Sequence, residues 1–120
     1  VLEPLIGYLM LAKKLYEGKK EFSGAWNFGP ENASYVSVKD LLGKTFQILG
    51  KGSYIAKGDP HKFEAQFLKL DINKAKKNLA WRPALNLNET LKLTLTWYEH
   101  FYRGEDMIGL TDRQIRSFFS

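Results

Sequence analysis

Cysteine is absent from this 120-residue chain, which excludes disulfides, thiolate catalysis and metal sites built on cysteine. The same absence fits a cytoplasmic location. Long apolar runs are missing as well, because the stretch from Leu5 to Leu15 is interrupted by Gly7, Lys13 and Lys14 and is too short to span a bilayer. The sequence therefore predicts no transmembrane segment, no signal peptide and no membrane partner.

The usual signatures of catalysis are also missing. The chain has no glycine-rich GxGxxG phosphate fingerprint, no Ser/His/Asp set and no Tyr-x-x-x-Lys pair of the kind used in hydride chemistry. Its two histidines, His61 and His100, lie far apart and lack the i, i+4 spacing of a helical zinc site. We expect no metal site, no bound cofactor and no catalytic residue within these 120 residues.

Positive charge is in excess, with 18 Lys and Arg against 13 Asp and Glu for a formal charge of +5. This excess favours anionic ligands in a general way, without choosing between a nucleotide diphosphate and a nucleic acid. One basic cluster alternates with apolar residues at helical spacing and is typical of a solvated helix face. No RNA- or DNA-binding motif accompanies it, so nucleic acid is not the expected partner. The cluster comprises Lys69, Lys74, Lys76, Lys77 and Arg82.

Apolar periodicity and terminal signals predict a mostly helical domain. A first helix is expected over 3–18, ended by Gly18, and its apolar stripe must face something. A second helix should run from the Ser37 cap to Gly50, and a longer one from an Asn86 and Glu89 capping pair to Gly104. Shorter helices are expected over 72–79, capped by Asp71, and over 112–119. The first helix's stripe consists of Leu5, Leu9, Ala12 and Tyr16.

Three short strands complete the expected fold. Residues 25–30, with Asn27 and Gly29, suggest a strand that runs into a turn; this turn either fixes the chain geometry or lines a cleft. Residues 53–56 and 67–70 are the other two candidates.

One polar loop is the best candidate for ligand binding. His61 follows a Gly-Asp-Pro turn and is close in sequence to Glu64 and Gln66. Such side chains can hydrogen-bond phosphates or sugar hydroxyls, and loops on a rigid scaffold are where such contacts concentrate. The alternative is an ordinary solvated surface loop.

Several longer phrases resemble a known family. Leu79-Ala80-Trp81-Arg82-Pro83, Leu87-Asn88-Glu89-Thr90-Leu91 and Trp97-Tyr98 resemble the C-terminal signature of extended short-chain dehydrogenase/reductase enzymes that act on nucleotide sugars. Leu2-Glu3-Pro4-Leu5 and Leu68-Lys69-Leu70-Asp71 are narrower, and with them the whole chain resembles the CDP-glucose 4,6-dehydratases within that family.

This resemblance implies a fold and a function. The chain would be an α/β protein region, mostly helical with short strands: residues 1–120 would form the C-terminal substrate-binding domain of a lyase, inactive alone. The NAD-binding Rossmann part and the catalytic residues would precede Val1, and the intact enzyme would be a homodimer. His61, Glu64 and Gln66 would contact the nucleotide-sugar substrate. Gln66 stands where relatives have His, and Ala80 where they have Gly.

Two other interpretations remain open. A dehydratase or epimerase acting on a dTDP- or GDP-sugar would carry the same signature. A non-catalytic basic domain that binds nucleic acid or a protein partner would carry the same charge. Because no strand precedes the first helix to receive it, we also expect this piece to expose apolar surface when alone.

Overall fold

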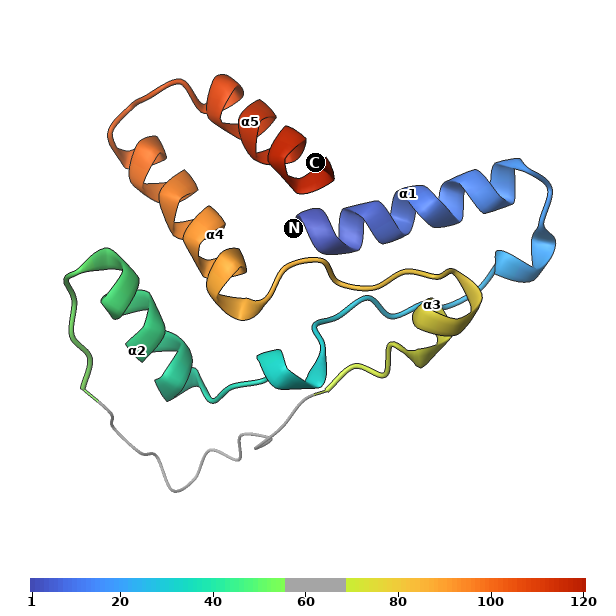
Figure 1. The fold of residues 1–120 in the computed structure, drawn as a ribbon, viewed down its shortest axis with the longest axis horizontal. Coiled ribbons are helices and arrows are strands. Elements are labelled where there is room, and N and C mark those ends of the chain that lie inside the picture. Colours follow the sequence, from blue (N-terminus) through green and yellow to red (C-terminus); the bar gives the residue numbers. More distant parts are fainter. Residues whose placement is uncertain (56–68) are drawn as a thin grey trace.

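The computed structural model describes residues 1–55 and 69–120, and all regular structure in these two ranges is helical (Figure 1). The long helices are α1 (Leu2–Tyr16), α2 (Val38–Leu49), α4 (Leu87–Tyr102) and α5 (Met107–Phe119). The short ones are α3 (Asn73–Asn78) and two 3-10 turns, η1 (Lys20–Phe22) and η2 (Asn32–Ser34). None of the described helices is long and apolar enough to cross a membrane.

The helices form two groups. Figure 1 shows α1 and α3 on one side of the molecule and α2, α4 and α5 on the other, joined by the extended segments 23–31 and 79–86. The molecule measures 52 × 42 × 21 Å and its radius of gyration is 17.6 Å. A compact domain of this length would have a radius of gyration of about 14 Å. The fold is therefore flat and open, with much apolar surface outside a core.

The hydrophobic core lies in the first group, which we call the α1–α3 lobe. Its buried hydrophobic residues lie in α3 or within a few positions of its ends, and Trp81 is the largest of them. Residues of α1, η1 and the 23–31 segment pack around this centre, so the first 31 residues meet the region of α3, which lies far from them in the sequence. The buried members are Ile72, Ala75, Leu79 and Trp81; the partly buried ones are Ile6, Met10, Leu11, Phe22, Trp26 and Phe28.

A close contact between α1 and the 23–31 segment sets the width of this lobe. Gly7 is buried in α1, and a Cβ at this position would overlap the ring of Phe28. Phe28 in turn meets Trp81 edge-on, with ring centroids 4.9 Å apart. Only glycine lets the helix approach the aromatic ring so closely.

The face of α1 that packs is not the expected one. Ile6, Met10 and Leu11 contact the core, whereas Leu5 and Leu9 of the predicted stripe are 45% and 63% exposed. Tyr16 is almost fully exposed as well. The prediction of a helix over 3–18 is confirmed, since α1 ends two residues before Gly18 (φ +79°). The described part of the chain leaves most of this stripe exposed, because Gly7 decides which side of α1 approaches the core.

Glu3 fastens the start of α1 to the segment after α3. Its backbone carbonyl accepts a hydrogen bond from Trp81 Nε1 (3.2 Å). Its side-chain Oε1 accepts two more, from the backbone N–H groups of Ala84 (2.8 Å) and Leu85 (2.6 Å). These bonds span about 80 residues of sequence, and they join two of the phrases on which the family resemblance rests.

The second group is built on the α4–α5 hairpin. The predicted capping box is confirmed: Asn86 Oδ1 accepts from the Glu89 N–H (3.0 Å) and Glu89 Oε2 from the Asn86 N–H (2.7 Å). Between the helices, Trp97 Nε1 donates to Thr111 Oγ1 (3.0 Å), and Gln114 Nε2 donates to the Leu93 carbonyl (2.9 Å). Among the described residues of the hairpin, Leu110 alone has a buried side chain.

Helix α2 packs against α4 and has the ends that the sequence predicts. Ser37 Oγ accepts from the Asp40 N–H at 3.1 Å, and Gly50 ends the helix in the left-handed conformation (φ +66°).

Other expectations need correction. No strand forms over 25–30, 53–55 or 69–70, because none of these segments pairs with another to make a backbone ladder; residues 56 and 67–68 lie outside the described ranges. Asp71 does not occupy the cap position of α3, which is Ile72, although its Oδ1 accepts from the Asn73 N–H (2.9 Å). Helix α5 begins earlier than predicted because Asp106 caps it, accepting from the N–H groups of Ile108 and Gly109.

Candidate functional site

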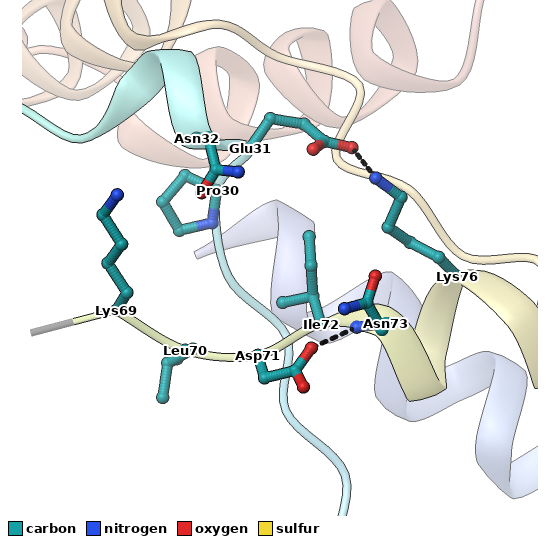
Figure 2. A pocket seen from close by; sticks show the side chains of 9 residues that line it. All are labelled: Pro30, Glu31, Asn32, Lys69, Leu70, Asp71, Ile72, Asn73 and Lys76. Atoms are coloured by element: carbon teal, nitrogen blue, oxygen red, sulfur yellow. Dashed lines mark hydrogen bonds and ion pairs between the residues drawn. The ribbon is translucent and has the colours of Figure 1, made fainter.

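A polar pocket of about 270 Å³ lies where residues 30–32 meet the segment that leads into α3 (Figure 2). Figure 2 shows its side chains coming from two separate stretches of the chain, with Pro30 and Asn32 on one side and Leu70 and Asp71 on the other. The lining residues are Pro30, Glu31, Asn32, Lys69, Leu70, Asp71, Ile72, Asn73 and Lys76.

The two walls of the pocket are held together at close range. A Cβ at Gly29 would stand 3.3 Å from the Leu70 side chain and 3.5 Å from Ile72 Cγ2, so glycine lets this stretch lie directly against the opposite wall. Asn27 Nδ2 donates to the Asp71 carbonyl (3.3 Å). Tyr35 Oη accepts from the Leu70 N–H (3.0 Å). The Asn-Phe-Gly-Pro phrase forms no turn, and its Pro30 lines the cleft, which is one of the two roles that the sequence left open.

Lysines of the basic cluster make specific contacts across this site. Lys76 Nζ pairs with Glu31 Oε1 at 2.7 Å, and Lys76 is partly buried. Lys74 Nζ donates to the Ala25 carbonyl (2.8 Å) and lies 4.3 Å from the centroid of the Trp26 ring. These side chains are largely on the surface, as predicted. However, they bind the 25–31 segment to α3 rather than form a uniform solvated face.

The chemistry of the pocket is balanced in charge. Two ammonium groups, Lys69 and Lys76, are set against two carboxylates, Glu31 and Asp71, and the amides of the two asparagines add both donors and acceptors. A lining of this kind can hydrogen-bond a polyhydroxylated ligand, whose hydroxyls donate and accept. It can also place a lysine ammonium group against a ligand phosphate.

The loop residues named from the sequence, His61, Glu64 and Gln66, lie outside the described residues, as does the rest of 56–68. Lys69, the first described residue after them, lines the pocket. The assignment of these three side chains to substrate binding stays a prediction.

Sequence reasoning missed the pocket itself. Glu31, Asn32 and Asn73 carry no motif, and they meet only because the two walls are brought together by Gly29. The available signal was the Asn-Phe-Gly-Pro phrase, whose glycine marks a close approach of backbone. His100, by contrast, is engaged within its own helix, with Nδ1 2.8 Å from the Thr96 carbonyl oxygen. Over 1–55 and 69–120, no group of three or more His, Cys, Asp or Glu side chains gathers as a metal site.

Comparison with known proteins gives one clear relationship, while no family model matches the chain. Over 121 aligned residues, the chain is 39% identical to the CDP-glucose 4,6-dehydratase of Salmonella typhimurium. The alignment covers all of this chain and 34% of that enzyme, in its C-terminal part. The chain is therefore similar to a nucleotide-sugar dehydratase, as the sequence phrases suggested, and spans about one third of the length of the curated relative it matches.

Proposed function

We propose that this chain is the C-terminal, substrate-binding portion of a CDP-glucose 4,6-dehydratase, a lyase that converts CDP-D-glucose to CDP-4-dehydro-6-deoxy-D-glucose. The observation that supports the proposal most strongly is the 39% identity, which extends over the whole chain. The structure adds a physical reason for two of the shared phrases, because Glu3 of the opening and Trp81 of the signature are hydrogen-bonded to each other.

In this proposal NAD is bound elsewhere in the complete enzyme, in a Rossmann part. The described residues contain no strand–turn–helix unit on which a dinucleotide could lie. When bound there, NAD would supply the redox chemistry that the loss of water from the hexose requires. The contribution of this chain is to bind and orient the nucleotide sugar.

The polar pocket is the site that we assign to this task. Its paired ammonium and carboxylate groups and its two asparagines suit the hydroxyls and phosphates of a nucleotide sugar. His61, Glu64 and Gln66 would add further contacts from the neighbouring loop. The complete enzyme would be a cytoplasmic homodimer with neither a nucleic-acid nor a membrane partner.

The direct test is turnover by the complete polypeptide that contains this chain, supplied with NAD. CDP-glucose, dTDP-glucose and GDP-mannose are incubated separately, and products are identified by mass spectrometry through the loss of one water. We expect CDP-glucose alone to react. Reaction of a different nucleotide sugar would retain the class and replace the substrate, whereas no reaction with any of them would overturn the proposal.

A pair of asparagines on one helix tests the pocket. Asn73 lines it, whereas Asn78, at the other end of α3, is exposed and away from it. Losing one hydrogen bond to substrate costs about 1 kcal/mol, or roughly a fivefold rise in KM. Asn73→Ala should show that rise and Asn78→Ala should not. Equal KM values for both variants would show that the pocket does not bind the substrate.

The loop is tested with His61→Ala and Glu64→Ala in the complete enzyme. Both should weaken binding of CDP-glucose more than they lower the melting temperature. Unchanged affinity in both variants would show that the loop is an ordinary solvated one.

The alternative of a basic domain that binds nucleic acid has less support. It needs lysines that are available to phosphates, and Lys74 is engaged with the Ala25 carbonyl and the Trp26 ring. Binding of the protein to a polyanion that falls steeply with salt would favour this alternative.

A further inference from the structure

We propose that the apolar groove between the start of α1 and the α4–α5 hairpin is the docking site for the polypeptide that leads into Val1 in the complete protein. This inference rests on the proposed function, in which the chain is the last third of a longer enzyme. It concerns a surface away from the polar pocket, since the two cavities share no lining residue.

The groove has the size and chemistry of an interface. Its volume is about 470 Å³, larger than that of the polar pocket. Two regions that lie far apart in the sequence meet in it: the first turn of α1, and the region that includes the segment before α4 and the facing sides of α4 and α5. Its apolar walls are formed chiefly by Leu2, Leu5, Leu85, Leu93, Trp97 and Ile115.

The surface around the groove is incompletely buried. Leu5 and Ile115 are 45% and 39% exposed although both line it, and the exposed Leu9 continues the same face one turn further along α1. Covering such side chains stabilises a protein by about 25 cal/mol for each Å² of apolar surface removed from water. The predicted stripe of α1 thus does face a partner in this proposal, but one outside the described chain.

The position of Val1 identifies the occupant. Val1 itself lines the groove, and the similar Salmonella enzyme is about three times as long as this chain, which matches its C-terminal part. In an enzyme of that length the polypeptide must reach Val1 at the edge of the groove. An intramolecular segment held there has a high effective concentration, whereas a second copy of the chain would have to associate from solution.

The absence of cysteine from this chain makes the test simple. Thr94→Cys places a thiol in the groove, and Lys92→Cys places one two residues earlier on α4, roughly on the opposite side of the helix. In the complete protein we expect maleimide to label Thr94→Cys about tenfold or more slowly than Lys92→Cys, as a covered site requires. Each thiol is identified by the mass of its peptide. Equal rates would overturn the proposal.

The occupant is identified by crosslinking from the same position. A maleimide that carries a photoreactive group is attached to the thiol of Thr94→Cys, with a reaction time long enough for this slowly reacting site. Crosslinks to residues upstream of Val1 within one polypeptide support the proposal, and crosslinks to a second copy overturn it. Turnover of CDP-glucose by Lys92→Cys is measured in parallel. An active enzyme with an open groove refutes this inference alone, whereas a covered groove in a protein that turns over no nucleotide sugar refutes only the proposed function.

Discussion

Trp81 and Trp97 are the same side chain in two settings, and each donates its indole N–H to an oxygen about 3 Å away. Trp81 is 2% exposed, because α1, α3 and the 23–31 segment surround it. Trp97 is only partly buried, because it borders the open groove between α1 and the α4–α5 hairpin. The α1–α3 lobe therefore has a core, whereas the apolar face of the α4–α5 hairpin remains partly exposed. Two helices leave one side of each apolar stripe open, and burial begins when a third element closes it.

The hairpin's aromatic residues form a ladder instead of a core. Trp97 stacks on Phe101 with centroids 5.4 Å apart and an interplanar angle of 11°, and Tyr98 stacks on Tyr102. Tyr98 and Phe101 nevertheless remain about half exposed. Stacking along one helix orders these rings but removes little of their surface from water.

The largest effect should come from exchanging the two tryptophans for alanine. Trp81→Ala removes the centre of the core and should cost about 3–5 kcal/mol. Trp97→Ala, which removes a partly exposed ring and one hydrogen bond, should cost less than half of that. The free energy of unfolding from urea titration measures both. Equal losses would show that the hairpin is as tightly packed as the lobe.

A pair of helical glycines should separate the packed and open regions further. Gly7→Ala forces a methyl group into the Phe28 ring and should cost about 1–3 kcal/mol. Gly43→Ala, in α2, meets open space and should stabilise the protein by about 0.5–1 kcal/mol through helix propensity. Thermal melts of the two variants should shift in opposite directions. A stabilising Gly7→Ala would mean that α1 does not lie against Phe28.

Ala80 lies between the core residues Leu79 and Trp81 and has a strained backbone conformation. It is the one non-glycine residue with a positive φ, +56°, among those described. Replacing it with glycine, the residue expected here from the family resemblance, should stabilise the protein by about 1 kcal/mol, since the left-handed region costs other residues that much or more. Ala84→Gly, in the same segment without a positive φ, should destabilise it slightly. Identical melting temperatures for the two variants would contradict the strain.

The smallest effect is expected from an exposed ion pair at the end of α1. The hydrogen bond from Lys19 lowers the pKa of the Glu17 carboxyl, and Glu17 raises the pKa of Lys19. The contribution of Glu17 is present above its unfolded pKa and is lost as the pH falls through its folded pKa; that of Lys19 is lost as the pH rises through its raised pKa. Glu17→Gln should leave the neutral-pH melting temperature nearly unchanged because salt and water screen the pair. A clear loss at neutral pH would show that the exposed end of α1 matters to the lobe.

Local chemistry was predictable where it depends on neighbouring residues. The capping box of Asn86 and Glu89, the Ser37 cap and the Gly50 end of α2 all involve residues within a few positions of one another, and all are confirmed. The expected strands were wrong over the described residues because a strand needs a distant partner, which no local pattern supplies. The polar pocket was missed for the same reason.

Periodicity, short-range hydrogen bonds and characteristic phrases were enough to predict the helices, the caps at Ser37 and Asn86 and the relationship to a nucleotide-sugar dehydratase. The buried face of α1 depends instead on packing, because it is set by the close approach of Gly7 to Phe28. Packing also decided that Glu3 would hold the backbone at Ala84 and Leu85. Contacts between residues some 80 positions apart are fixed by packing in three dimensions, which a one-dimensional pattern does not encode.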